Sequence, residues 1–266
     1  MNKDIIIGYG EIGKAIYKCY EDNEKPLKYD LKDNDTVYSK VDIHCMHICI
    51  PFFNKDQFID AVRGHISSFK PKIVIIHSTV PPGTTRIIFE HEKDNIEAIA
   101  HSPCTGVHPY LFESMKFIFS KIFGVIGTSE GKSCIFDTLV VDMGLKKIDQ
   151  YNSPEETEMT KILSTTVYAH HIAIVTEINR ICEEYGLDFD NVFTKWTKNY
   201  NQGYKKLDKE HFVRPVLKPH KGGEFGGHCI KENIKLIEKY MTTTWLTKIQ
   251  PKEFVHGKDD IENIPN

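Results

Sequence analysis

The chain has 266 residues, a formal net charge of −3 and an apolar content of 40%, enough to bury one large core or two modest ones. A pI near 6.5 gives no general attraction for nucleic acid. Because no apolar run reaches about 18 residues and no signal-peptide pattern opens the chain, we expect no membrane span. Seven cysteines without a Cys-x-x-Cys pair indicate reduced thiols in a cytoplasm, with no metal site.

The first element is a strand-like run at 4–7 that leads into a glycine-rich turn and a helical pattern. Gly8, Gly10 and Gly13 have the spacing of a dinucleotide-binding turn, where glycines let the backbone approach a pyrophosphate at a helix N-terminus. Asp30 ends a second strand-like stretch, where its carboxylate can accept hydrogen bonds from a ribose diol and would repel a 2′-phosphate. We therefore predict NAD as the cofactor. Its expected contacts are Gly8, Gly10, Glu11, Ile12, Gly13, Asp30, Pro51, Ser78 and Thr79.

Short apolar runs then recur at 43–50, 73–76, 96–100 and 123–126, the spacing of a parallel sheet. Helical patterns between them, such as the one around Phe58 to Ile66, fit right-handed crossovers. Residues 1–150 are thus predicted to form a doubly wound, Rossmann-type α/β domain.

A second, smaller all-helical domain is predicted at 151–247, built on one long helix. Ser153, Pro154 and Glu156 form a capping box, and apolar residues recur at helical intervals until Gly186. The surplus apolar face near 154–185 predicts a homodimer contact, the alternative being a helix buried within one chain. A polar tail follows at 248–266.

The segment 195–221 is aromatic and basic. Such a run is either a solvated face or an anion-binding loop. In the second interpretation Arg214, with Lys218 or Lys221, binds an anionic group of a small-molecule substrate.

Cys229 follows a glycine-rich stretch and begins an amphipathic helical pattern. Unpaired N–H groups at a helix N-terminus stabilise a thiolate, so we predict that Cys229 is a nucleophile. The alternative is a small buried hydrophobe, which is the interpretation we adopt for the cysteines in periodic or apolar stretches.

Five segments resemble the UDP-glucose/GDP-mannose dehydrogenase family in order and spacing: Gly8 to Gly13, Ser78 to Thr84, Ser102-Pro103, Glu158 to Lys161 and Phe225 to Cys229. The resemblance covers about residues 4–240. It implies an enzyme that oxidises a sugar-nucleotide alcohol twice, with two NAD and a cysteine thioester stage.

By this resemblance Cys229 forms the thiohemiacetal and thioester, Lys161 stabilises the oxyanion, and Thr79 helps to hold the catalytic water. Lys161 fits physically, because a charge on an apolar-patterned helix needs a partner or a substrate; a snorkelling surface lysine is the alternative. The expected substrate-binding residues are His101, Cys104, Thr165, Arg214, Gly226 and Gly227.

Several of these positions depart from the family pattern. Asn233 stands where the family has an aspartate thought to assist water attack, and an amide cannot act as a general base. Thr165 replaces an asparagine, and Cys104 and His108 stand where glutamates are common. Cys104 and His108, together with His101, thus place imidazole and thiol groups where the family has acidic side chains. We predict His108 as the acid/base, a structural histidine being the alternative; a metal site is disfavoured.

The sequence stops about 25 residues after the Cys229 helix, whereas family members continue into a second Rossmann-like domain. We therefore expect a smaller substrate or contacts from another subunit. The predicted activity is NAD-dependent oxidation of a polar, anionic sugar compound at a cleft between the two domains. A single oxidation, as in β-hydroxyacid dehydrogenases, and a silent NAD-binding subunit are the alternatives.

Overall fold

The chain forms two compact units, Met1–Lys161 and Ile162–Asn266, which are described here one at a time. For 228–232 only the backbone is described. The computed structural model describes residues 3–20, 23–30, 41–106, 109–220, 228–237 and 240. The predicted fold class, a Rossmann-type α/β unit followed by helices, is confirmed.

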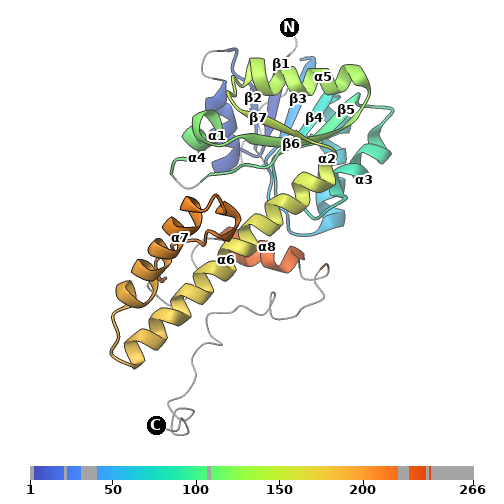
Figure 1. The fold of residues 1–266 in the computed structure, drawn as a ribbon. Coiled ribbons are helices and arrows are strands. Elements are labelled where there is room, and N and C mark those ends of the chain that lie inside the picture. The colour runs from blue at the N-terminus through green and yellow to red at the C-terminus, as the bar shows by residue number, and fades with distance from the viewer. Residues whose placement is uncertain are drawn as a thin grey trace. The chain divides into compact units, whose positions relative to one another are not determined.

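Unit 1 is built on a seven-stranded sheet of order β2-β1-β3-β4-β5-β6-β7 (Figure 1). The order reverses at β1, which lies between β2 and β3, and such a switch point places a ligand site at the carboxyl ends of the strands. The strands are β1 (Lys3–Ile7), β2 (Leu27–Tyr29), β3 (Ile43–Ile48), β4 (Ile73–Ile76), β5 (Ala98–His101), β6 (Lys121–Gly127) and β7 (Ile148–Tyr151). The helices of unit 1 are α1 (Glu11–Cys19), α2 (Lys55–Phe69), α3 (Thr84–Glu92), α4 (Leu111–Glu113), α5 (Ser129–Asp137) and the π-helical turns η1 (Ser114–Ile118) and η2 (Thr138–Asp142).

Strand β6 departs from the parallel sheet that the apolar runs predicted. It pairs antiparallel with β5, with His101 opposite Gly124. Parallel neighbours need a long crossover, usually a helix, and the connection from β5 to β6 contains only the short α4 and η1. The first residue of β6, Lys121, therefore lies at the carboxyl end of β5. Strand β7 was not predicted, because its sequence Ile-Asp-Gln-Tyr carries no apolar run.

The alternation of strand side chains fills two cores, one on each face of the sheet. Ile6 packs with residues of α1, α4 and α5. Ile5 and Ile7 point to the other face and pack with α2 and α3. Both faces of the central strands are thus buried, which explains why these strands read as continuous apolar runs.

One lysine is buried between two helix ends. Lys116, 4% exposed, donates hydrogen bonds to the carbonyl oxygens of Cys19 and Met143. Cys19 is the last residue of α1 and Met143 follows η2. The ammonium group therefore satisfies carbonyls that a helix C-terminus leaves without intrahelical partners.

The long helix α6 (Pro154–Glu184) begins and ends as predicted. The Ser153 hydroxyl accepts the N–H of Glu156, and the Glu156 carboxylate accepts the N–H of Asn152. At the other end Gly186 has φ +65° and the Leu187 N–H bonds the Cys182 carbonyl at 2.7 Å, which is a Schellman stop.

Glu158, on the first turns of α6, is fully buried and caps another helix. Its carboxylate accepts the N–H of Gly83 at 2.6 Å, and the N–H and hydroxyl of Thr85 at 2.8 and 2.6 Å. These groups form the start of α3, where a negative charge is favourable. Burial nonetheless outweighs these bonds and raises the pKa of Glu158 to about 7.

Unit 2 contains the rest of α6 and a helix that the sequence analysis missed. The helical turn η3 (Asp190–Lys195) leads into α7 (Trp196–Lys206) in the basic segment, and η4 (Glu210–Phe212) and α8 (His228–Ile237) follow. Trp196, Tyr200 and Tyr204 recur every four residues and successive rings are in contact, with centroids 5.2 and 4.6 Å apart. That spacing was the available signal for a helix. Across the described part of the chain, every helix falls short of the length and apolarity that crossing a membrane requires.

The buried ammonium of Lys116 gives a stability prediction. Replacing Lys116 with Met removes the donor from two carbonyls at helix ends, and we expect a loss of about 1–3 kcal/mol of unfolding free energy in urea denaturation. The matched change Lys146→Met, at an exposed lysine nearby in the sequence, should stay within about 0.5 kcal/mol. Equal stabilities of the two variants would contradict a structural role for Lys116.

Candidate functional site

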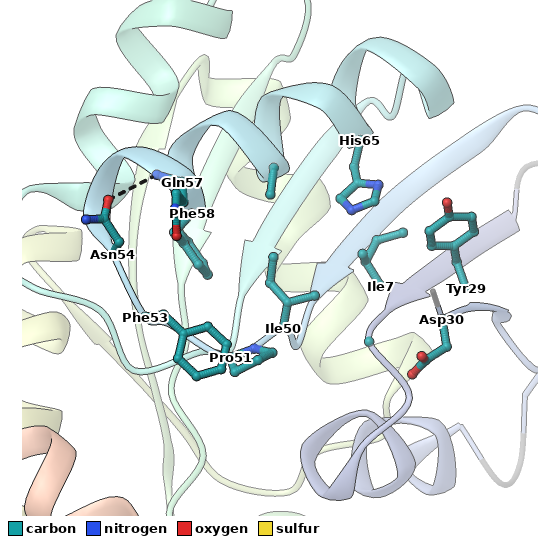
Figure 2. Close-up of a pocket in the computed structure, with 12 residues that line it drawn as sticks. Ile7, Tyr29, Asp30, Ile50, Pro51, Phe53, Asn54, Gln57, Phe58 and His65 are labelled. Atoms are coloured by element: carbon teal, nitrogen blue, oxygen red, sulfur yellow. Dashed lines mark hydrogen bonds between the residues drawn. The ribbon is translucent and has the colours of Figure 1, made fainter. Parts of the chain in front are cut away.

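A pocket of about 360 Å³ opens at the carboxyl ends of β1, β2 and β3 in unit 1 (Figure 2). Asp30 forms its wall beside β2, while residues after β3 and on the first turns of α2 form the opposite side (Figure 2). The lining residues are Ile7, Gly8, Tyr29, Asp30, Ile50, Pro51, Phe53, Asn54, Gln57, Phe58, Ala61 and His65. The pocket is thus largely apolar with one carboxylate, a lining that suits an adenosine group.

The glycine turn between β1 and α1 is sterically required. Gly8 has φ +91°, and a Cβ there would lie 2.9 Å from the Cys49 carbonyl oxygen. A Cβ on Gly13 would lie 2.1 Å from the Gly8 carbonyl oxygen, so only glycine fits. A Cβ on Gly10 would meet no atom within 4 Å. The turn is therefore closed on the protein side and open at Gly10, where a pyrophosphate could reach the N-terminus of α1.

Two further predicted contacts hold the walls of this pocket. The Asp30 carboxylate accepts the N–H of Tyr9 at 2.9 Å, which fixes it beside the glycine turn. The Ser78 hydroxyl donates to the Ile50 carbonyl at 2.6 Å and so joins the end of β4 to the end of β3. A lined pocket, an open helix N-terminus and a fixed acid together fit NAD.

A second group of predicted residues meets on the segment that follows β5. Lys161 Nζ donates to the Cys104 carbonyl at 2.8 Å. From the other side, Lys121 Nζ donates to the carbonyls of Ser102 and Pro103 at 2.7 and 2.9 Å and contacts Cys104 Sγ at 3.4 Å. Segment 102–104 is therefore fixed by two ammonium groups.

His101 has an interior position. It is 0% exposed, and its ring contacts the Thr157 hydroxyl at 2.8 Å and the Ser78 carbonyl at 3.1 Å. Burial lowers the pKa of His101 to about 3, so the ring is neutral. Both ring nitrogens are bonded within the protein, and contact with a substrate would require one of these bonds to break.

In unit 2 the structure brings together two positions that depart from the family pattern, Asn233 and Thr165. Asn233, 3% exposed, donates from its side-chain amide to the Thr165 hydroxyl at 2.9 Å. Cys229 is the second residue of α8, the helix-start position that the sequence predicted. Of the other predicted residues, Thr79 is half-buried after β4, while His108, Gly226 and Gly227 lie outside the described residues.

Arg214 is exposed on unit 2 and is held by aromatic rings. Its guanidinium lies 4.1 Å from the centroid of the Tyr200 ring and 5.3 Å from that of Trp196, and it donates to the Tyr200 hydroxyl at 3.2 Å. Backbone groups of Arg214 bond the Asn201 side chain. The guanidinium plane is thus oriented, and stacking of this kind leaves a planar donor edge for a carboxylate or phosphate.

The sequence analysis missed three buried residues next to this site. Lys121 is 2% exposed, and His47 and His77 are 0% and 1% exposed. The signal was a polar residue inside an apolar strand run or close to one of its ends, because a buried polar group must have partners.

Comparison with known proteins confirms the resemblance. Residues 155–249 match the model of the UDP-glucose/GDP-mannose dehydrogenase family, central domain. The chain is 30% identical over 172 residues to a UDP-N-acetyl-D-mannosamine dehydrogenase of Methanocaldococcus jannaschii. That match covers 62% of this chain and 36% of the relative, so the chain spans about a third of the relative's length.

Solved structures share the fold at low identity. A 3-hydroxyisobutyrate dehydrogenase of Mycobacterium tuberculosis with L-serine superposes with a TM-score of 0.64 at 14% identity, covering 93% of this chain and 90% of that one. A UDP-glucose dehydrogenase of Pyrobaculum islandicum gives a TM-score of 0.62 at 15% identity, covering 90% and 64%. These likenesses show a common architecture.

The glycine turn predicts opposite outcomes for two similar substitutions. Gly13→Ala places a Cβ against the Gly8 carbonyl, and we expect a loss of about 1–3 kcal/mol in urea denaturation together with weaker dinucleotide binding. Gly10→Ala should leave the stability of the free protein nearly unchanged but weaken binding measured by calorimetry, because its Cβ occupies the open approach. Unchanged binding in Gly10→Ala would mean that the ligand does not approach there.

Proposed function

Because this chain is related to the UDP-glucose/GDP-mannose dehydrogenases, we propose that it is an NAD-dependent dehydrogenase that oxidises an alcohol of a sugar nucleotide or a similar anionic sugar compound. The observation that carries the proposal is the pocket at β1, β2 and β3, with its sterically required glycine turn and the fixed carboxylate of Asp30. These features are typical of a dinucleotide site.

The cofactor contacts of the proposal all lie in unit 1. Gly10 and the first N–H groups of α1 would hold the pyrophosphate, and Asp30 would accept hydrogen bonds from the adenosine ribose. When bound, NAD supplies the acceptor for the substrate's hydride. The cofactor site is thus supported by geometry, whereas the sugar nucleotide is suggested by the relatives.

The chemistry is assigned to Cys229, Lys161 and Thr79 by the family resemblance. The place of Cys229 in the first turn of α8 supports a reactive thiolate. The bond of Lys161 to the Cys104 carbonyl holds its ammonium group in a fixed place, as stabilisation of an oxyanion requires.

Two features support the choice of an anionic substrate and a homodimer. Arg214 presents an oriented guanidinium in a segment rich in lysine. Val167, Ile174 and Ile181 of α6 are 51%, 54% and 42% exposed, and a second copy of the chain could cover them. The six cysteines whose side chains are described form no disulfide, which supports a reducing compartment such as the cytoplasm.

A single two-electron oxidation is the second candidate, and Asn233 favours it. Its amide donates to the Thr165 hydroxyl and cannot take a proton from water. Hydrolysis of a thioester would then lack the base that the family uses, and oxidation would stop after one hydride transfer.

The function is tested by NADH absorbance with a panel of sugar nucleotides, sugar phosphates and hydroxy acids. We expect turnover with a sugar nucleotide or sugar phosphate, and Cys229→Ser should abolish any acid product while sparing the first hydride transfer, because serine is a poor nucleophile without a base. Cys134→Ser is the control, since it changes a half-buried thiol of unit 1. NAD binding without turnover of any compound would favour a silent subunit.

The cofactor preference is tested separately. Asp30→Ala should weaken NAD binding by about 1–3 kcal/mol and narrow the preference over NADP, because a charge-assisted hydrogen bond and a repulsion are both lost. Asp60→Ala, at an exposed position of α2, should leave both affinities unchanged in calorimetry. Equal affinity of the parent protein for NAD and NADP would reject the role of Asp30.

A further inference from the structure

A continuous chain of buried polar groups crosses unit 1 along the sheet. It begins at Asp4 on β1, next to a polar pocket of about 400 Å³ that also includes His44 and Asp142. The Asp4 carboxylate contacts the Tyr20 hydroxyl at 2.6 Å, and that hydroxyl lies 2.7 Å from His47 Nε2. The fourth member of the chain is His77, whose ring contacts that of His47.

The second half of the chain joins two histidine rings. His47 Nδ1 lies 3.0 Å from His77 Nε2, and the rings are nearly parallel, at 15°. His77 Nδ1 then lies 2.7 Å from the Ser102 carbonyl oxygen. The chain therefore runs from the pocket at Asp4 to segment 102–104, which Lys121 and Lys161 bind. We call Asp4, Tyr20, His47 and His77 the buried polar chain.

The donor and acceptor roles along the buried polar chain follow from its last contact, with the Ser102 carbonyl. A carbonyl oxygen only accepts, so His77 Nδ1 carries a hydrogen. Lys121 Nζ also lies 3.3 Å from His77 Nδ1 and donates to Ser102 O, Pro103 O and Cys104 Sγ. The Ser102 oxygen is nearer to Nδ1, at 2.7 Å, and two acceptors at that distance would repel each other, so the hydrogen belongs on Nδ1. A neutral His77 then accepts at Nε2, and the donor to it is His47 Nδ1–H.

The same reasoning continues to the pocket. With its hydrogen on Nδ1, a neutral His47 accepts at Nε2, so Tyr20 donates its O–H to His47. The Tyr20 oxygen then receives a hydrogen only from a protonated Asp4. The arrangement that satisfies all four contacts thus contains one proton more than an ionised aspartate with two neutral histidines.

We propose that the buried polar chain is a proton-binding site, which holds one proton on Asp4 and relays it through Tyr20 to His47. In the transfer the Asp4 O–H bond breaks as an O–H bond forms on Tyr20, and the former Tyr20 O–H bond breaks as an N–H bond forms at His47 Nε2. Asp4 becomes a carboxylate and His47 an imidazolium, and no electrons are exchanged. The proton comes from solvent in the Asp4 pocket. This site is independent of the proposed dehydrogenase activity.

The charged and titratable groups around the chain favour the proton on Asp4. Burial dominates and brings the pKa of Asp4 up to about 6. The Tyr20 hydroxyl, His44 and the Cys45 N–H lower this pKa, and the charge of Asp142 raises it. At the other end burial, and then the positive charge of Lys121, lower the pKa of His47 to about 3. Burial, and then the positive charge of Lys121, likewise lowers the pKa of His77, which also faces His101.

Loss of the proton from Asp4 breaks one hydrogen bond of the chain, the one between Tyr20 and His47. An ionised Asp4 attracts the Tyr20 O–H, and His47 Nε2 then loses its donor. The pH of the pocket is in this way transmitted to the ring of His47. We expect the transition near pH 6, the pKa of Asp4.

Nitrogen NMR of the histidine rings in the full chain tests the proposal without any substitution. At pH 5 both His47 and His77 should be Nδ1–H tautomers, and the Nε2 signal of His47 should shift with a midpoint near pH 6. An Nε2–H tautomer of His77, or a His47 signal that is unchanged from pH 5 to 8, would overturn the proposal.

Variants test whether the transition of His47 depends on Asp4 itself or on its neighbours. Asp4→Asn, whose amide can donate to Tyr20 at every pH, should abolish the His47 transition, and Tyr20→Phe should uncouple His47 from Asp4. The matched control Asp142→Asn should keep the transition and lower its midpoint, because a like charge is removed. Retention of the transition in Asp4→Asn would contradict the assignment.

Metal binding is the competing interpretation of the atoms around Asp4. Ligand atoms of Asp4, Cys45 and His47 lie within 4.8 Å of one another, and could hold a metal ion, although the Tyr20 hydroxyl lies between two of them at hydrogen-bond distances. Addition of Co²⁺ to the intact protein should give no thiolate absorption band. A band that Cys45→Ala removes would show a metal site and overturn the proposal.

Discussion

The ammonium group of Lys121 is the constraint on which the carboxyl edge of the sheet depends. It bonds the carbonyls of Ser102 and Pro103, and it lies 3.3 Å from His77 Nδ1 and 3.4 Å from Cys104 Sγ. A buried cation of this kind is tolerated only with such a full set of acceptors. Lys121 reaches this edge because β6 runs antiparallel: in a parallel strand the first residue would lie at the opposite edge. Strand direction therefore decides the chemistry of segment 102–104.

Local signals in the sequence were sufficient for the elements that obey local rules. The turn of Gly8 and Gly13 was predictable because backbone contact excludes any side chain there. The long helix was predictable at both ends, through the Ser153 cap and the positive φ of Gly186. The Asp30 position also followed, since the acid of a dinucleotide turn lies at a regular distance after the glycines.

The remaining features depend on residues far apart in the sequence. Tyr20, His47 and His77 are separated by 27 and 30 residues, and no periodicity reveals that their side chains meet. The direction of β6 is a property of the connection before it, which carries no signal that distinguishes a short helical turn from a crossover helix. Helix α7 was missed for a different reason. Its lysines obscured the aromatic residues that recur every four positions, whose rings contact one another along the helix. Family resemblance identified Asn233 and Thr165 as departures but could not show that they bond each other.

The position of Lys116 has a consequence for local unfolding. Its ammonium group is shared by the last residue of α1 and the residue after η2, two segments separated by more than a hundred residues in the sequence. Fraying of either helix end would leave the buried Lys116 ammonium short of an acceptor. The free energy of opening one end is therefore coupled to the free energy of opening the other. Such segments open as one cooperative unit, and their amide hydrogens exchange at a common rate. Because α1 carries the glycine turn, this cooperative unit extends from the far end of η2 to the dinucleotide pocket.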